Sequence, residues 1–569
     1  MGFLVLLTLL AATKGGRTFT GLLFYDVTTL FLFYKSSNPF YKTKLDRPLL
    51  GFLSIATVSG LYSIVTHRLG FLFLTTLYMH ALNFYLFYSL RDETFYDRYL
   101  KWIEGIGMVF VLILFIFQFQ ELDVKNIFPN ENLLSAVLNC GLLISIARLQ
   151  DKDRYSLIGV FPTILFLMSQ LLLSSRGGII ALSSTLFLYL ALNWKKALRP
   201  LEIFLGFILL CLALWPQSLR DVCNSFLNPL GYSRTIIWKG ALQTILARPW
   251  TGWGLGNFGN AYQQYKLPVE FEIGRFEKTT NFAHNEFLDV FAQMGMVGFI
   301  VYCWLIFLIF YSALKTLKNN PNNWKKIAAS LCLISLTVHS FFDFIFHLPM
   351  LLFLFLTFSA LILEEGTQTF PSLTAIKKLT LPAFFLMGTL FASYILKNIP
   401  AEHSRALLIW AHRLNPYDID IIEKLATIEK NEEKKWLLKG IKTHPTQEGL
   451  YAKMAKIYIR EGKIEDGISM LQKATSLNPK FPFYYSELAD IYVSLGNFSK
   501  AAELYKTAIA LEPIYREAHY KLGTLYFKIG DMEKAKIFLE NAAKIEKAKI
   551  HSDSPYVRHL LGIEVKKSL

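Results

Sequence analysis

The residue best suited to chemistry is a histidine that closes a long polar segment. The segment 217–285 lies between two apolar runs and ends in His284-Asn285, just before the second run. A neutral imidazole accepts a proton from a hydroxyl group, and histidine is the commonest general base near neutral pH. Because a lone histidine is more often structural than catalytic, the spacing by itself leaves both interpretations open.

Two arginines upstream are candidates for binding an anionic substrate. Arg176 stands in the short segment 174–178 between two apolar runs, and Arg234 precedes Trp238 by one helical turn. A guanidinium keeps its charge at every relevant pH and grips phosphate with two parallel hydrogen bonds. The two glycines after Arg176 could let a phosphate approach a helix start. The alternative for Arg176 is an arginine whose charged end simply reaches the membrane surface.

Three tryptophans lie near Arg234. Trp238, Trp250 and Trp253 could stack on sugar rings, or they could pack this segment on a bilayer interface, where tryptophan is favoured. The interface is the preferred interpretation. The glycines of 252–256 predict a tight turn, because no strand precedes them as a dinucleotide-binding motif requires.

Other ionisable residues are expected to be structural. His339 and Asp343 fall within a later apolar run at a spacing of four, which predicts that they pair with each other on one helix face. The chain contains no P-loop, and its five cysteines show no metal-ligand spacing. We therefore expect neither a metal nor a cofactor, and a reaction driven by an activated donor.

The elements that must position these residues are apolar helices. The chain has 569 residues, 53% hydrophobic and 18% charged, which is fewer charges than a soluble protein of this length normally carries. A membrane-spanning helix needs about 20 mostly apolar residues. Thirteen runs are candidates: 2–13, 20–34, 48–66, 69–89, 102–119, 132–148, 156–174, 177–193, 201–216, 286–312, 327–346, 349–364 and 379–397. The first is short and resembles the core of a signal peptide, but it lacks a basic leader and a clear cleavage site.

The loops between these runs predict their orientation. Nineteen lysines and arginines fall in one set of alternate short loops and five in the other. The positive-inside rule places the richer set in the cytoplasm, so the segment 217–285 and everything after residue 397 are expected outside. These loops also account for the net charge of +16, and no nucleic-acid motif accompanies it.

The tail 398–569 is charged and periodic. Prolines and glycines recur every 34 residues, at Pro445, Pro479 and Pro513 and at Gly462, Gly496 and Gly530. This pattern resembles the tetratricopeptide repeat. A helix 401–414 and a weaker unit from about Pro416 are expected before the repeats, and a cap at 554–566 after them. Such arrays stack into a binding surface, so we expect a partner here; the alternative is a spacer.

Four separated segments together resemble the O-antigen ligase superfamily of membrane glycosyltransferases. They are 129–133, 175–177, 234–258 and 284–298, and the segment 339–349 also fits. The resemblance implies an all-α fold, in which residues 1–397 form a polytopic transmembrane helical bundle of the GT-C-like kind with about 12–13 spans. An α-solenoid of tetratricopeptide repeats follows over 398–569. Both the loop 217–285 and the repeats would face outward from the bacterial inner (cytoplasmic) membrane.

The same resemblance implies a reaction. Members of the superfamily transfer a glycan from undecaprenyl diphosphate to an acceptor hydroxyl, with inversion at the anomeric carbon and without a metal. Carried over, Arg176 and Arg234 would hold the diphosphate, and His284 would orient or deprotonate the acceptor hydroxyl. We expect further substrate contacts from three neighbouring residues, Asn285, Trp238 and Trp253.

The resemblance leaves the acceptor open. This chain is predicted to end outside after an additional span, whereas many ligases end in the cytoplasm. The acceptor could be a glycolipid, as in O-antigen ligation; a growing glycan, as in O-antigen or exopolysaccharide polymerases; or a protein, as in O-oligosaccharyltransferases. An alternative from another class is a non-enzymatic export or assembly factor whose repeats recruit a protein partner.

Overall fold

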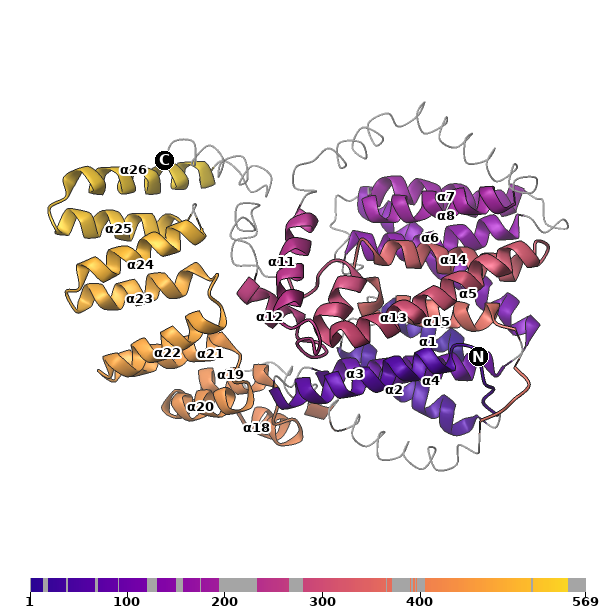
Figure 1. The fold of residues 1–569 in the computed structure, drawn as a ribbon, viewed down its shortest axis with the longest axis horizontal. Coiled ribbons are helices and arrows are strands. Elements are labelled where there is room, and N and C mark those ends of the chain that lie inside the picture. Colours follow the sequence, from indigo (N-terminus) through magenta and orange to yellow (C-terminus); the bar gives the residue numbers. More distant parts are fainter. Residues whose placement is uncertain are drawn as a thin grey trace. The chain divides into compact units, whose positions relative to one another are not determined.

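The computed structural model describes most of the chain (Figure 1). The described residues are 2–13, 19–36, 39–66, 70–90, 92–119, 130–149, 157–173, 175–193, 233–265, 280–364, 366–370, 405–512 and 515–550, with isolated positions between 389 and 396. The predicted span 201–216 and the predicted cap 554–566 lie outside them, as do most of the predicted span 379–397 and about half of the predicted loop 217–285.

Within these ranges the fold is all-α, as predicted. The described residues contain no β-strand, and their one isolated bridge joins Tyr41 to Thr369. The chain divides into two compact units. Unit 1 comprises residues 1–60, 71–228 and 284–394, and unit 2 comprises 61–70, 229–283 and 395–569.

Unit 1 is a bundle of apolar helices. Eleven of the thirteen predicted apolar runs coincide with its helices: α1 (Gly2–Ala12), α2 (Phe19–Lys35), α3 (Asp46–Thr66), α4 (Gly70–Tyr88), α5 (Glu93–Phe119), α6 (Glu131–Arg148), α7 (Leu157–Leu173), α8 (Arg176–Leu192), α13 (Glu286–Asn319), α14 (Trp324–Ser340) and α15 (Pro349–Ile362). By length and composition, two stretches of the described residues are long and apolar enough to cross a membrane, Glu93–Phe117 and Glu286–Asn319. A bundle of 12–13 spans therefore stays a prediction.

The helix ends of unit 1 form two sets of contacts. At one end the Ser175 hydroxyl, just before α8, donates to the Asn132 side chain at the start of α6 over 2.7 Å. At the other, Lys325 at the start of α14 pairs with Glu93 at the start of α5. Lys315 near the end of α13 lies 3.5 Å from a carboxylate just after α15. The charged loops predict that the Ser175 contacts lie outside and the lysine contacts inside, and this orientation stays a prediction.

Helix α6 forms the centre of the bundle. Every residue from 133 to 147 is buried, although three of them are polar. Ser135 donates to Gln170 on α7 over 2.5 Å, and the Asn139 amide donates to a carbonyl on α8 over 2.9 Å. Ser145 shares a 2.7 Å hydrogen bond with Thr163. Paired polar groups of this kind hold apolar helices in a defined arrangement.

The tail in unit 2 is a stack of helix pairs (Figure 1). The pairs are α21 (Glu448–Arg460) with α22 (Ile464–Leu477), α23 (Pro482–Ser494) with α24 (Phe498–Leu511), and α25 (Arg516–Lys528) with α26 (Met532–Ile550). The glycine between the helices of each pair has a φ of 76°, 74° or 87°, at Gly462, Gly496 and Gly530 respectively. Because L-residues with side chains avoid this region, the 34-residue spacing of these glycines is a conformational requirement.

Shorter helices precede the repeats. They are α18 (Arg405–Leu414), α19 (Ile419–Ile428) and α20 (Glu433–Thr443). Their apolar faces share one buried core with the first repeat, which includes Leu408, Leu425, Trp436 and Leu450. The weaker unit expected from about Pro416 is therefore packed onto the array.

Replacing Gly496 by alanine should destabilise the second repeat by about 1 kcal/mol, because the new side chain must adopt the left-handed conformation. Gly449 is the matched control, since an added Cβ there also meets nothing within 4 Å but its φ is not positive. Hydrogen exchange over 482–511 should speed up in Gly496→Ala and not in Gly449→Ala. Equal exchange in the two variants would contradict the conformational explanation.

Candidate active site

His284 stands at a sharp turn into α13. Its φ of 52° makes it the one residue other than glycine with positive φ among the described residues. Such a conformation is uncommon for a side-chain-bearing residue and persists only where its surroundings enforce it. The imidazole Nδ1 lies 3.1 Å from Oδ1 of Asp343, which is fully buried, whereas 18% of the His284 side chain is exposed. Its ring also meets Phe344 edge-on, with centroids 4.9 Å apart.

The partner of Asp343 differs from the prediction. The spacing of four predicts a pair with His339, but the structure hydrogen-bonds the Asp343 carboxylate to His284. Helix α14 ends at Ser340, so the helical periodicity behind the prediction stops before Asp343. The His339 side chain is buried and packs beside Gly177.

Asn285 caps α13. Its side-chain oxygen accepts the Leu288 backbone N–H over 3.1 Å, and its side-chain nitrogen donates to the Phe341 carbonyl over 2.9 Å. A cap of this kind satisfies one of the free N–H groups at a helix start. The expected substrate contact of Asn285 stays a prediction beside this structural role.

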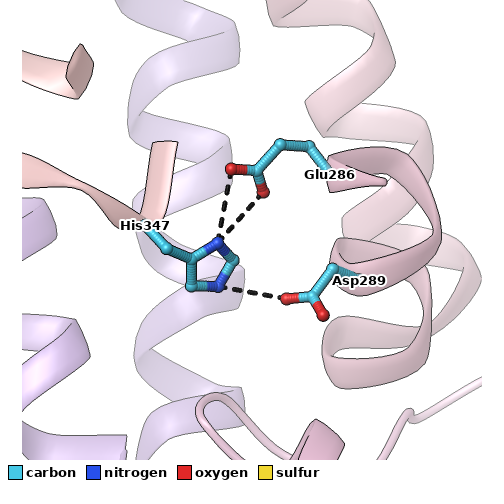
Figure 2. A group of neighbouring side chains, drawn as sticks. All are labelled: Glu286, Asp289 and His347. Carbon is cyan, nitrogen blue, oxygen red and sulfur yellow. Dashed lines mark hydrogen bonds and ion pairs between the residues drawn. The ribbon is translucent and has the colours of Figure 1, made fainter. Parts of the chain in front are cut away.

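A second cluster of ionisable side chains begins two residues after His284, and the sequence did not predict it (Figure 2). His347, at the end of the short 3-10 helix η5 (Ile345–His347), lies between two buried carboxylates. Its Nδ1 is 3.3 Å from Glu286 and its Nε2 is 3.1 Å from Asp289. We call these three side chains the His347 clamp. The spacing of Glu286 and Asp289 on one helix face was visible in the sequence, but nothing there tied them to a residue about 60 positions away.

The charges of the clamp determine its protonation. Burial alone would lower the pKa of His347, but the carboxylates of Glu286 and Asp289 outweigh burial and raise the pKa to about 10. The ring is therefore an imidazolium at neutral pH and donates a hydrogen bond from each nitrogen. The backbone N–H of Phe346 also donates to Glu286 over 2.6 Å, which satisfies a further lone pair.

The same three residues are spaced closely enough to hold a metal ion. Each offers one ligand atom, and these atoms lie within 4.8 Å of one another. A metal ion binds imidazole through an unprotonated nitrogen, so metal binding and the imidazolium are alternative states of this cluster. The hydrogen bonds on both sides of the ring favour an ion-paired cluster over a metal site.

Arg176 is the first residue of α8 and is partly buried. Ser175 caps this helix by accepting the Gly178 N–H over 3.2 Å, and its hydroxyl donates to Asn132. Asn130 in turn caps α6 by accepting the Asn132 N–H over 2.7 Å. Asn130 thus caps the start of α6, and Asn132 holds the turn before Arg176 through Ser175.

The glycines after Arg176 have a packing role. A Cβ on Gly178 would lie 1.8 Å from Ser135 Oγ, and a Cβ on Gly177 would lie 3.1 Å from His339 Nε2. The start of α8 is thus pressed against α6 and the end of α14. The proposed use of these glycines, to admit a phosphate, stays a prediction; close helix packing already requires them.

The structure brings the chain segments that carry two of the three predicted catalytic residues, Arg176 and His284, against one short segment. Gly177, next to Arg176, packs on His339 and Phe342, and His284 bonds Asp343. Both therefore adjoin the five-residue segment 339–343. The amino termini of α8 and α13 meet this segment as well, and helix starts present N–H groups and positive potential to an anion.

Arg234 and its tryptophans belong to unit 2. Arg234 and Trp238 lie on α11 (Ser233–Ala247), and both are partly buried. A second helix, α12 (Phe258–Tyr265), follows it. The turn between these helices has positive φ at Gly252, Gly254 and Gly256, as the tight-turn prediction expects.

The Trp253 side chain makes packing and hydrogen-bond contacts within unit 2. Its indole N–H donates to the Thr244 carbonyl over 2.8 Å, and the Arg248 guanidinium lies 4.1 Å from its ring centre. Trp250, by contrast, is 71% exposed. These contacts give Trp253 a packing role in the turn, and its predicted contact with substrate remains untested.

The fold and the site define an all-helical protein. It has an apolar helical bundle with a histidine–carboxylate pair at one end, and a repeat array follows the bundle in the chain. Residues 161–303 match the model of the O-antigen ligase family, a range that includes Arg176, Arg234 and His284. Residues 489–530 match a TPR repeat model, and 449–481 and 517–549 match a tetratricopeptide repeat model. The predicted resemblance to an O-antigen ligase with carboxyl-terminal tetratricopeptide repeats is confirmed.

The family match supports glycan transfer of the O-antigen ligase or polymerase type by a glycosyltransferase-like enzyme, in a family that is typically membrane-embedded. A comparison with curated proteins finds no match.

Similar solved structures include a crystal structure of MamA, with 22% identity over 26% of this chain and 88% of that chain, at a TM-score of 0.24. YrrB, described as a TPR protein with an unusual peptide-binding site, shows 17% identity over 32% of this chain and 90% of its own, also at 0.24. MamA from Desulfovibrio magneticus RS-1 shows 16% identity over 26% and 85%, at 0.22. No functional conclusion follows from similarity at this level.

The His347 clamp should make stability depend on pH. Because the folded-state pKa is raised from 6.5 to about 10, the stabilisation is fully present below about pH 6.5 and is lost as the pH rises through about 10. The difference in Tm between the wild-type protein and His347→Gln should therefore be largest near pH 6.5 and shrink toward pH 10. A difference that does not change with pH would exclude the imidazolium.

Proposed function

We propose that this protein transfers a glycan from an undecaprenyl-diphosphate-linked donor to an acceptor hydroxyl, on the outer face of the bacterial inner membrane. The observation that carries the proposal is the hydrogen bond between His284 and the buried Asp343, formed beside the helix start that bears Arg176. It supplies a base, a group that orients the base, and a cation for the leaving group at one end of one bundle.

The Asp343 carboxylate decides which imidazole nitrogen is basic. An ionised carboxylate accepts a hydrogen bond, so Nδ1 carries the proton and Nε2 keeps its lone pair. In the proposed reaction the acceptor oxygen attacks the anomeric carbon of the donor while Nε2 takes the hydroxyl proton. The bond between the anomeric carbon and the diphosphate oxygen breaks, so direct displacement inverts that carbon.

The leaving group is undecaprenyl diphosphate. Its charge grows as the bond breaks, and a guanidinium that pairs with diphosphate oxygens stabilises that charge. Arg176 takes this role in the proposal from the start of α8. Arg234 is also proposed to bind the diphosphate, and Asn285, Trp238 and Trp253 are proposed to contact the glycan. No metal or other cofactor is proposed.

The membrane arrangement is part of the proposal. Unit 1 would cross the bilayer with about 12–13 spans, so that residues 1–397 form the catalytic domain and 398–569 an outer repeat domain. It is supported by the two contact sets at the helix ends, in which lysine-rich ends and the His284 end are separate.

Loss of His284 should abolish transfer. With the full-length protein in lipid vesicles and an undecaprenyl-diphosphate-linked oligosaccharide as donor, His284→Ala should lower the release of undecaprenyl diphosphate about 10²–10⁴-fold, as expected for a general base. Arg176→Ala should lower it about 10²–10³-fold, because the leaving charge loses its partner. Adding a chelator should not change the wild-type rate.

The matched control is Arg98→Ala. Arg98 is an exposed arginine near the start of α5, at the lysine-rich end of the bundle, and it should leave the rate unchanged. A His284→Ala protein that keeps more than about a tenth of the wild-type rate would refute the catalytic role.

The identity of the acceptor distinguishes O-antigen ligases, polymerases and protein O-oligosaccharyltransferases. Lipid A-core glycolipid, a second lipid-linked glycan and a serine-containing peptide, offered in parallel, represent ligation, polymerisation and protein glycosylation. We propose ligation to a glycolipid first. An export factor would instead tolerate His284→Ala and lose function when the repeats are removed.

A further inference from the structure

We infer that His347 is a positioning residue for His284, acting through Glu286 and Asp289 to hold the first turn of α13 in place. The inference rests on the proposed function, because it assigns a purpose to a cluster next to the proposed base. His347 itself is not proposed to touch the substrate.

The turn that carries His284 is joined to the segment 341–347 along its whole length. Asn285 bonds the Phe341 carbonyl, and the Phe287 ring stacks on the Phe341 ring with centroids 4.2 Å apart. Glu286 accepts the Phe346 backbone N–H over 2.6 Å. The His284–Asp343 hydrogen bond is thus one contact in a row, and the His347 clamp closes the row at its far end.

The clamp is the part of this row that needs a cation. Glu286 is 2% exposed and Asp289 is fully buried, and they stand three residues apart on one face of α13. Two buried like charges at this spacing repel each other and disfavour the folded turn. His347 lies between them with one ring nitrogen on each (Figure 2), so a single imidazolium compensates both. Gln293, one turn further along, also donates to Asp289.

Two routes connect the clamp to His284. Along the chain, Glu286 follows His284 by two residues, so a shift of Glu286 moves the strained backbone at His284. Through space, the Phe344 ring meets His284 with centroids 4.9 Å apart and His347 with centroids 6.3 Å apart. Phe344 also donates its backbone N–H to Asp343 over 3.0 Å. Release of His347 therefore frees both the base and its carboxylate partner.

The test compares two variants of the full-length protein in lipid vesicles. The first, His347→Leu, removes the cation between Glu286 and Asp289 and should destabilise the fold. The triple variant Glu286→Gln, Asp289→Asn, His347→Gln carries no buried charge in the clamp, so it keeps the fold but loses the ion pairs. We expect kcat to fall about 10–100-fold in the triple variant, while KM for the lipid-linked donor changes less than about threefold.

A second measurement reports on His284 without activity. Diethyl pyrocarbonate modifies accessible histidines, and mass spectrometry gives the rate at His284. We expect this rate to rise severalfold in the triple variant, because the turn loosens. His444→Gln in the repeat domain is the control and should change neither kcat nor the labelling of His284.

The outcomes separate the two proposals. A His284→Ala protein with wild-type activity overturns the proposed function. An inactive His284→Ala protein, together with a triple variant that keeps wild-type kcat and wild-type labelling of His284, overturns the positioning role alone. A triple variant in which KM rises and kcat is unchanged also overturns it, because that pattern assigns the clamp to donor binding.

Discussion

Compensation of buried negative charge is the constraint on which this site depends. Asp289 and Asp343 are fully buried and Glu286 nearly so, all at one end of an apolar bundle. A buried carboxylate is costly unless it is paired and hydrogen-bonded. The structure pairs all three with two histidines: Asp343 bonds His284, and Glu286 and Asp289 bond His347. Electrostatics therefore links the start of α13 to the end of α14.

The two histidines differ because their surroundings differ. His347 lies between two carboxylates that raise its pKa, so it behaves as a fixed cation. His284 has one carboxylate partner on Nδ1 and remains partly exposed. Nδ1 of His284 bonds one carboxylate, whereas both ring nitrogens of His347 bond carboxylates. The surroundings of His347 thus favour a structural cation, and in the proposed function His284 is the proton acceptor.

Packing places the arginine of α8 beside this charge cluster. Gly178 has no room for a side chain next to Ser135, and Gly177 has little next to His339. Close approach of α8 to α6 and α14 therefore requires glycine at both positions. The same approach brings the capped start of α8, with Arg176, to the segment that holds Asp343. The glycines of α8 and the buried charges near α13 thus position the segments that carry the candidate residues.

The amino-acid sequence by itself determined the helical classes, the repeat tail and the candidates His284, Arg176 and Arg234, because these depend on local composition and spacing. The prediction that Asp343 pairs with His339 was wrong, because it required the helix to continue past Ser340. The sequence did not predict the His347 clamp. Only the tertiary structure decided those partners. Where α14 ends, and which residue lies opposite Glu286 and Asp289, depends on how distant helices pack, and periodicity along one segment contains no record of that packing.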